Sequence, residues 1–422
     1  MRKNLRLVAA VGVAALALAG CSGSSGGDPK TIELWTSWSE GEATATALEP
    51  LIQTWAEENG YTVNQSNFTY DQIHEKLIAS AAGGNLPDVV WGLPEYVGEF
   101  SKLGILADVS TAWEAWGDAD QVSDPVKAAM TVDGQVVGFP YETTARAYLV
   151  HDSLLQEAGV DVPETWDDVL AVGSAVDDAT ESSFYGVTGA GVREPQELLV
   201  YLAQQGLTIA SEQNGGGFAN TWNENPAELK KATAVFQFYK DLMASGAVNE
   251  NSATYGWEDT DENFATGLTA SFVTGNWLAE RESTNADIMS DVSVHPIPYP
   301  SEGKPATYIE SKPIFTMAGS DSLAASTELA EQFASQEWQE AAFADRSALE
   351  SVTTDSKWSK DFAALVDTGV TYPPISLGEV TQNMIDALAM VLQDGKSPEE
   401  AAKWLSDAVN SSLETSGDAA GS

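Results

Sequence analysis

The chain alternates between strand and helix patterns over its first hundred residues. Short β-favouring runs are followed by apolar residues at helical spacing, and Gly60 ends the first helical run. The expected segments, in chain order, are a strand at 31–35, a helix over 48–60, a strand at 61–68, a helix around 73–78 and a strand at 89–91. This alternation predicts an α/β sheet of parallel strands with right-handed crossovers, which binds ligands at the carboxyl ends of its strands.

A second pattern, at residues 138–159, predicts a passage between two lobes. A strand ends in a polar group made of Glu142, Thr143, Thr144 and Arg146, and a new strand at 148–150 leads into a helix that stops before the next glycine. Small ligands commonly lie in clefts between domains. The polar group is therefore the first candidate for a binding site.

The amino terminus has the features of a lipoprotein signal. A basic start and a short apolar segment lead to Leu18-Ala19-Gly20-Cys21, which matches a bacterial lipobox. We expect residues 1–21 to be the signal peptide and lipobox, and residues 22–29 to be a flexible tether. Two acyl chains on Cys21 would anchor the mature protein at the outer face of the cytoplasmic membrane, without a membrane-spanning helix.

Composition excludes several kinds of chemistry. The chain has 63 acidic and 20 basic residues, so it repels nucleic acid and anionic ligands. The acids are scattered, which is typical of a solvated, salt-tolerant surface. Cys21 is the one cysteine, so disulfides and thiol catalysis are excluded after the lipobox.

Known catalytic and metal motifs each lack a required residue. Ile78 stands where a zincin has its second histidine, Phe264 replaces the glycine of a calcium loop, and Met390 replaces the first glycine of a P-loop. We therefore expect a binding protein that is not an enzyme and uses no metal or cofactor.

Tryptophan and carboxylate residues predict the type of ligand. The chain has 13 tryptophans, and flat aromatic rings pack on the C–H faces of sugars while carboxylates and guanidinium groups bind the hydroxyls. The aromatic candidates at strand ends are Trp38, Trp91, Trp222, Trp257 and Trp277. The polar candidates are Glu142 and Arg146 at the first passage, with Tyr308 and Glu310 at a later one.

Several motifs give the chain a family resemblance. The residues Pro87-Asp88, Gly104-Ile105-Leu106, Ala145-Arg146-Ala147 with Ala158-Gly159, and Gly275-Asn276-Trp277 match motifs that are common in one family. The chain resembles the extracellular solute-binding proteins of bacterial carbohydrate ABC transporters, family 1, which are similar to maltose-binding protein, and it resembles their lipoprotein type.

This resemblance implies a fold, a site and a partner. The fold would be a two-lobe, periplasmic-binding-protein-like α/β fold, with a mostly parallel sheet flanked by helices in each lobe and about three hinge crossings, near 141–147, 295–312 and 346–355. The N-lobe would comprise 30–141 plus 303–350, the C-lobe 145–295 plus 351–414, and residues 415–422 would fray. The resemblance adds Glu40, Glu95 and Tyr96 to the ligand candidates and supports Trp91. The implied partners are a carbohydrate and the ABC permease subunits, and the protein is expected to be a monomer.

Three other functions remain open from the sequence. A receptor for a cationic solute such as a polyamine would suit the acidity. A secreted glycoside hydrolase would need two carboxylates at a fixed spacing across one bond. An adhesin would bind polysaccharide without a transporter.

Overall fold

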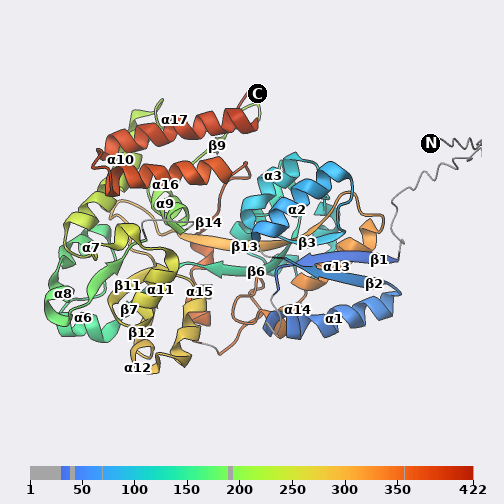
Figure 1. Ribbon diagram of the computed structural model, residues 1–422, viewed down its shortest axis with the longest axis horizontal. Coiled ribbons are helices and arrows are strands. Elements are labelled where there is room, and N and C mark those ends of the chain that lie inside the picture. The colour runs from blue at the N-terminus through green and yellow to red at the C-terminus, as the bar shows by residue number, and fades with distance from the viewer. Residues whose placement is uncertain (1–29, 39–42, 69, 189–192, 356, 422) are drawn as a thin grey trace, which may run out of the picture.

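The computed structural model describes residues 30–38, 43–68, 70–188, 193–355 and 357–421. It forms two lobes side by side, joined by long central strands (Figure 1). The expected two-lobe α/β architecture is confirmed. The signal peptide, lipobox and tether lie outside the described residues, and so does Glu40.

The sheet of the first lobe has six strands in the order β14-β13-β3-β1-β2, with β6 beside β13. The strands β1, β2 and β3 are parallel, as their alternation with helices predicted. The long strand β13 runs antiparallel to both β3 and β6. The bounds are β1 Thr31–Thr36, β2 Thr62–Asn67, β3 Val89–Trp91, β6 Phe139–Ala145, β13 Thr307–Thr316 and β14 Gly369–Val370.

Helices cover this sheet and bury its apolar side chains. Leu48, Ile52 and Trp55 of α1 lie on one helical face and are buried, because the spacing of these positions aligns them. The helices of this lobe are α1 Ala43–Asn59, α2 Tyr70–Gly83, α3 Val97–Lys102, α4 Ser110–Ala115, α5 Asp124–Ala128, α13 Leu323–Ala334 and α14 Gln336–Ala342, with the 3-10 turns η1 Pro94–Tyr96 and η2 Ala119–Gln121 and the hairpin β4 Thr131–Val132 and β5 Gln135–Val136.

The second lobe has a four-stranded sheet in the order β12-β7-β11-β8. The strand β7 is antiparallel to both of its neighbours, and β11 and β8 are parallel. Both sheets are therefore mixed. The expectation of a mostly parallel sheet is confirmed in the first lobe, where three of the five strand pairings are parallel. It is wrong in the second lobe, where two of the three pairings are antiparallel. The reason is that β7 enters directly from the first lobe without a crossover helix. The bounds are β7 Ala147–His151, β8 Ser183–Gly186, β11 Thr269–Thr274 and β12 Val292–His295.

The helices of the second lobe begin with the caps that the sequence suggested. Thr165 and Asp168 form a capping box at α7, and Ser397 and Glu400 form one at α17. The other elements are α6 Asp152–Ala158, α7 Trp166–Val172, α8 Ala175–Thr180, α9 Arg193–Gln204, α10 Pro226–Ala244, α11 Trp257–Ala265, α12 Ala286–Met289, α15 Ser359–Ala363, α16 Gly378–Leu392 and α17 Pro398–Ser416, with η3 Ser252–Thr254, η4 Asn276–Ser283, η5 Val366–Thr368, β9 Ser211–Glu212 and β10 Phe218–Ala219.

The carboxyl-terminal residues pack against the second lobe. The helices α16 and α17 lie along α10 (Figure 1). Residues 417–420, for which the sequence predicted a loose end, are hydrogen-bonded: Phe218 N donates to the Asp418 carbonyl, and Ala420 N donates to the Phe218 carbonyl.

The chain passes from lobe to lobe at the ends of long strands. One residue, Arg146, separates β6 in the first sheet from β7 in the second. The chain returns between β12 and β13. Thr307, at the start of β13, accepts a hydrogen bond from Arg146 N at 3.1 Å, so the two passages lie side by side.

Candidate functional site

Arg146 is the centre of a group of side chains at the passage between the lobes. It is 5% exposed, and its Nη2 donates to Gln196 Oε1 at 2.7 Å. The same nitrogen lies 3.6 Å from Glu310 Oε2. Its guanidinium carbon lies 4.6 Å from the ring centre of Trp277 and 5.4 Å from that of Tyr308, within cation–π range. Among the described residues its Nε atom has no hydrogen-bond partner.

Trp277 reaches this group from the other sheet. It follows β11 at the start of η4, and its Nε1 donates to Asp261 Oδ2 at 3.1 Å. The hydroxyl of Thr274 donates to the other oxygen of Asp261, which fixes the carboxylate. A Cβ on Gly275 would lie 1.8 Å from the indole ring, so only glycine lets the ring fold back to this position. This contact gives a physical reason for the glycine of the Gly275-Asn276-Trp277 motif.

Glu95 reaches the group from the first lobe. It lies in η1, just after β3, and Tyr308 Oη donates to its Oε1 at 3.4 Å. Its Oε2 is buried and has no hydrogen-bond partner among the described residues. Burial, together with the negative charge of Glu310, raises the pKa of Glu95 to about 7. Glu95 therefore exchanges its proton near neutral pH.

A cavity of about 410 Å³ adjoins Glu95. Its walls come from α2, η1 and α3 of the first lobe and from the start of α16 of the second lobe, so both lobes border it. Tyr96 lies in its wall, with its ring 5.0 Å from the ring of His74. The lining residues are His74, Glu75, Glu95, Tyr96, Glu99, Leu377, Gly378 and Thr381.

The structure thus brings together five of the predicted ligand residues at one place between the lobes, and Tyr96 lies in the adjoining cavity. We call the five residues the interlobe cluster. Its members are Glu95, Arg146, Trp277, Tyr308 and Glu310.

Three predicted tryptophans lie elsewhere, in the cores of the lobes. Trp38 is 5% exposed and donates from Nε1 to Tyr141 Oη at 2.5 Å, inside the first lobe. Trp91 in β3 and Trp222 before α10 are buried as well. Their rings are packing groups here, because a residue at a strand end can point into either the core or the cleft. The side chain of Trp257 lies outside the described residues.

Glu142 is also placed differently from the prediction. Its Oε1 lies 2.6 Å from Lys312 Nζ, and its Oε2 lies 2.5 Å from Arg346 Nε. Burial would raise the pKa of Glu142, but the two cations and their hydrogen bonds outweigh burial and hold this pKa below its usual value. Both carboxylate oxygens are engaged within the first lobe. The expected role beside Arg146 in binding hydroxyls is therefore not supported by the geometry.

Sequence reasoning missed three residues around the cluster. Gln196 holds Arg146, Asp261 holds Trp277, and the ring of Tyr372 lies 5.7 Å from that of Tyr308. Asp261 belongs to the incomplete calcium-loop pattern in which Phe264 replaces the glycine, and the sequence suggests no other role for it. Gln196 and Tyr372 are far from the cluster in sequence and carry no motif, so no local signal identifies them.

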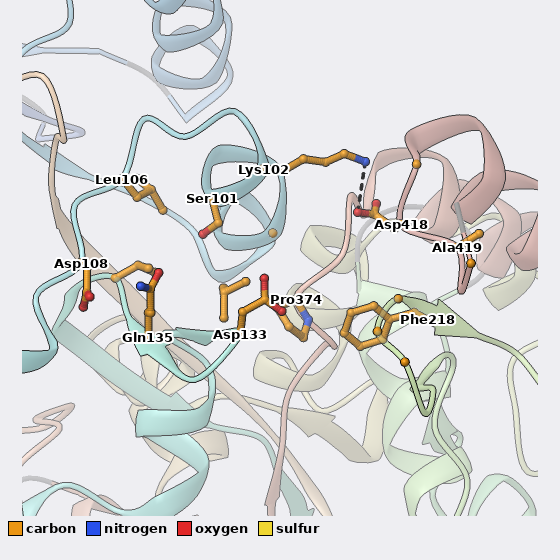
Figure 2. Close-up of a pocket in the computed structure, with 18 residues that line it drawn as sticks. Ser101, Lys102, Leu106, Asp108, Asp133, Gln135, Phe218, Pro374, Asp418 and Ala419 are labelled. Atoms are coloured by element: carbon orange, nitrogen blue, oxygen red, sulfur yellow. Dashed lines mark hydrogen bonds and ion pairs between the residues drawn. The ribbon is translucent and has the colours of Figure 1, made fainter.

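A separate hollow of about 440 Å³ lies between α3 and the carboxyl-terminal segment (Figure 2). Lys102 Nζ lies 3.3 Å from Asp418 Oδ1, which forms an ion pair between the lobes. Gly217 has a φ of +74°, and a Cβ there would lie 2.6 Å from the Ala419 carbonyl oxygen, so this close approach requires glycine. Phe218 is the one aromatic residue among the described residues that line this hollow, which makes the hollow a poorer platform for a sugar than the interlobe cluster.

The described residues contain neither a candidate membrane-spanning helix nor a candidate metal-ion cluster. No described helix combines the length and apolar character that crossing a bilayer requires. No group of three or more described histidine, cysteine or acidic residues is arranged to hold a metal ion.

Comparisons with known proteins give the family. Residues 51–368 match the family model described as bacterial extracellular solute-binding protein. Among curated relatives, an uncharacterized lipoprotein in the oleD 5' region of Streptomyces antibioticus is 29% identical over 161 residues, which is 37% of this chain and 35% of that protein. The chain thus matches well under two thirds of the length of this relative.

Solved structures show the same fold at low identity. The GacH receptor of Streptomyces glaucescens is 23% identical with a TM-score of 0.74, over 91% of this chain and 98% of that one. A cyclic alpha-maltosyl-1,6-maltose binding protein from Arthrobacter globiformis is 22% identical with a TM-score of 0.73, over 92% and 100%. The resemblance seen in the sequence is confirmed: the chain belongs to the bacterial extracellular solute-binding protein family.

Proposed function

We propose that this protein captures a saccharide outside the cytoplasmic membrane, in the cleft at the interlobe cluster, and delivers it to the permease of an ABC importer. It acts by binding, without catalysis, and Cys21 carries its lipid anchor. The sequence favours a neutral oligosaccharide over a cationic solute.

The observation that carries this proposal is the meeting of Trp277 with Arg146 and Glu95. The indole comes from one lobe and Glu95 from the other, while Arg146 lies on the strand passage between them. An indole face packs on the C–H face of a sugar ring. Carboxylates and a guanidinium group accept from and donate to the surrounding hydroxyls.

Similar proteins support a saccharide ligand. The GacH receptor was solved in complex with acarbose and an acarbose homologue, and the Arthrobacter protein is described by its cyclic maltosyl-maltose ligand. Both share the two-lobe fold with this chain. The same fold with a tryptophan and carboxylates at the passage suits a ligand of similar size.

Closure of the lobes is the mechanism that we propose for signalling. A ligand that contacts Trp277 and Glu95 together is held by both lobes only when they are closed, so binding favours the closed state. The permease then distinguishes closed from open protein. Capture followed by release suits an affinity of about 1 μM, or about 8 kcal/mol.

The test is a fluorescence titration with mono- and oligosaccharides. We expect at least one sugar to change the tryptophan emission, and Trp277→Ala to weaken its binding by about tenfold or more, because the stacking surface is lost. Trp404→Ala is the matched control, since Trp404 is 36% exposed on α17. If no sugar binds, or if Trp277→Ala binds like the native chain, the proposed function or its site is wrong.

Cleavage of the ligand would support the hydrolase alternative. The same sugars are incubated with the protein and analysed by chromatography. Intact sugar after incubation is the expected result.

A further inference from the structure

The interlobe cluster has more negative than positive groups. Arg146 is its one cation, and it faces the carboxylates of Glu95 and Glu310. The short bond of Arg146 Nη2, at 2.7 Å, goes to the neutral amide of Gln196, whereas Glu310 Oε2 is 3.6 Å away. The guanidinium group therefore neutralises the two carboxylates incompletely.

The adjoining cavity increases this imbalance. Glu75 and Glu99 line it together with Glu95, and none of the described residues in its lining is a lysine or an arginine. His74 is the one basic residue among these described lining residues, and its Nε2 is already 2.7 Å from Glu99 Oε2. A ligand in this cavity thus meets an acidic wall without a balancing cation.

Glu95 connects the cavity to the cluster and has an unused acceptor. Its Oε2 is buried without a hydrogen-bond partner among the described residues, and leaving such an oxygen unsatisfied is costly. Burial and Glu310 raise the pKa of Glu95 to about 7, so the site relieves its negative charge by taking up a proton. A ligand cation would relieve the same charge.

We propose that the saccharide captured here carries a protonated amine, and that its ammonium group pairs with Glu95 and Glu310. This inference rests on the proposed function and specifies its substrate class as amino sugars. An ammonium group has three donors and no acceptor, which suits two carboxylates, one of which has an unsatisfied oxygen. The indole of Trp277 and the guanidinium group of Arg146 remain available for the ring and its hydroxyls.

The proposal includes a proton balance. A protein with protonated Glu95 binds R–NH₃⁺, the carboxyl loses its proton to solvent, and the carboxylate pairs with the ammonium group. No bond to carbon is made or broken.

Charged and titratable groups near Glu95 come from every element around it. They are His74 and Glu75 of α2, Glu99 of α3, Tyr308 and Glu310 of β13, Arg146 and Tyr372.

The experiment is isothermal titration calorimetry with matched sugars that differ at one position. Glucosamine, galactosamine and the glucosamine trisaccharide are each compared with their N-acetylated and hydroxyl counterparts, and spermidine is included as an amine without a ring. For at least one set, we expect the amine to bind about tenfold more tightly than either counterpart at pH 7.

Proton release is the second readout. At pH 7, a group with a pKa of about 7 is half protonated, so ionisation of Glu95 on amine binding should contribute a release of roughly half a proton per ligand. The net proton exchange is measured from the dependence of the binding enthalpy on the ionisation enthalpy of the buffer, and the contribution of Glu95 is the difference between the native chain and Glu95→Gln, in which any proton taken up by the amine itself cancels. This difference should fall toward zero at pH 9, where Glu95 is already ionised.

Glu95→Gln removes this charge at nearly constant size. We expect it to weaken amine binding about tenfold, to remove the contribution of Glu95 to the proton exchange, and to weaken binding of the hydroxyl counterpart by a smaller factor than that of the amine. Glu58→Gln, on the exposed face of α1, is the matched control and should change neither. Thermal unfolding of each variant shows that it is folded.

The outcomes separate this inference from the proposed function. If sugars bind and the neutral member of each set binds as tightly as the amine, the inference is overturned and the proposed function stands. Tight amine binding that Glu95→Gln leaves unchanged also overturns it. If no sugar binds, the proposed function fails and the inference with it, and binding of spermidine alone would indicate a polyamine receptor.

Discussion

Replacing Glu142 by glutamine should destabilise the first lobe and leave ligand binding nearly unchanged. Glu142 is 8% exposed, and its two oxygens pair with Lys312 of β13 and with Arg346. Arg346 also donates to Thr44 of α1 at 3.0 Å. The carboxylate therefore links two neighbouring strands to the segment after α14, and through it to the first helix.

The magnitude follows from the two partners. Removing one member of a buried ion pair costs about 3–5 kcal/mol, because the remaining charge stays buried without compensation. Glutamine keeps one acceptor oxygen, and Arg346 is more exposed than Glu142, with 27% of its side chain accessible. We therefore expect a loss of about 3 kcal/mol in the free energy of unfolding at pH 7.

The loss should depend on pH with a definite sign. The pKa of Glu142 is lowered in the folded protein, so its stabilising contribution is fully present above the ordinary value of 4.5 and is lost as the pH falls through the folded value. The difference between the native chain and Glu142→Gln should therefore shrink on acidification, since both then hold a neutral side chain between two cations.

The assay is urea unfolding followed by tryptophan fluorescence, at pH 7 and at acidic pH. A double-mutant cycle with Lys312→Met should give a coupling energy of about 1–3 kcal/mol, because the two groups are in contact. Glu58→Gln is the control for the loss of one acidic charge. A cost below about 1 kcal/mol at pH 7, or a cost that grows on acidification, would refute this reasoning.

Three further predictions concern the cleft and the lobes. Gly275→Ala should weaken sugar binding about as much as Trp277→Ala in the fluorescence titration, since the added Cβ would lie 1.8 Å from the indole and must displace it. Lys102→Met should weaken sugar binding by no more than about fivefold, because it removes one interlobe ion pair whose lysine is 39% exposed. The difference in affinity between this variant and the native chain should become smaller in high salt, which screens the ion pair. Glu95→Gln should raise the free energy of unfolding of the ligand-free protein by about 1–3 kcal/mol at pH 8 and by much less at pH 5. The reason is that protonated Glu95, with its raised pKa, contributes stability that is fully present below 4.5 and is lost as the pH rises through about 7. Equal effects at both pH values in urea unfolding would contradict this assignment.

Periodicity in the sequence predicted most of the fold, for local reasons. The spacing of Leu48, Ile52 and Trp55 allows one buried helical face, and the capping residues Thr165 and Ser397 mark helix starts through short-range hydrogen bonds. The relative direction of the strands was harder to predict from the sequence. The antiparallel pairing of β7 with β11 and β12 depends on residues far apart in the chain, which no local pattern records.

The candidate site was predictable where a motif fixes the backbone, and less so where only the residue type was informative. Trp277 follows a glycine whose lack of a Cβ determines the position of the ring, so the motif itself encodes the geometry. Trp38 follows β1 and Trp91 ends β3, so both lie at strand ends as Trp277 does, but their rings are buried in the core. Lys312 and Arg346 form ion pairs with Glu142, so this carboxylate is engaged within the first lobe, whereas Glu95 lies in the interlobe cluster. Because both cations are distant from Glu142 in sequence, no local pattern indicates which of the two glutamates lies at the site.

The position of Arg146 explains why the cluster is suited to report closure. One residue joins β6 to β7, so its backbone is held by both sheets, and Thr307 at the start of β13 fixes it from the returning strand. Trp277 and Glu95 are attached to opposite sheets, at the ends of β11 and β3. A change in the angle between the lobes moves these two residues relative to each other while Arg146 stays at the pivot. A ligand that touches all three therefore senses the interlobe angle directly, and its binding energy differs between the open and closed states as population shift requires.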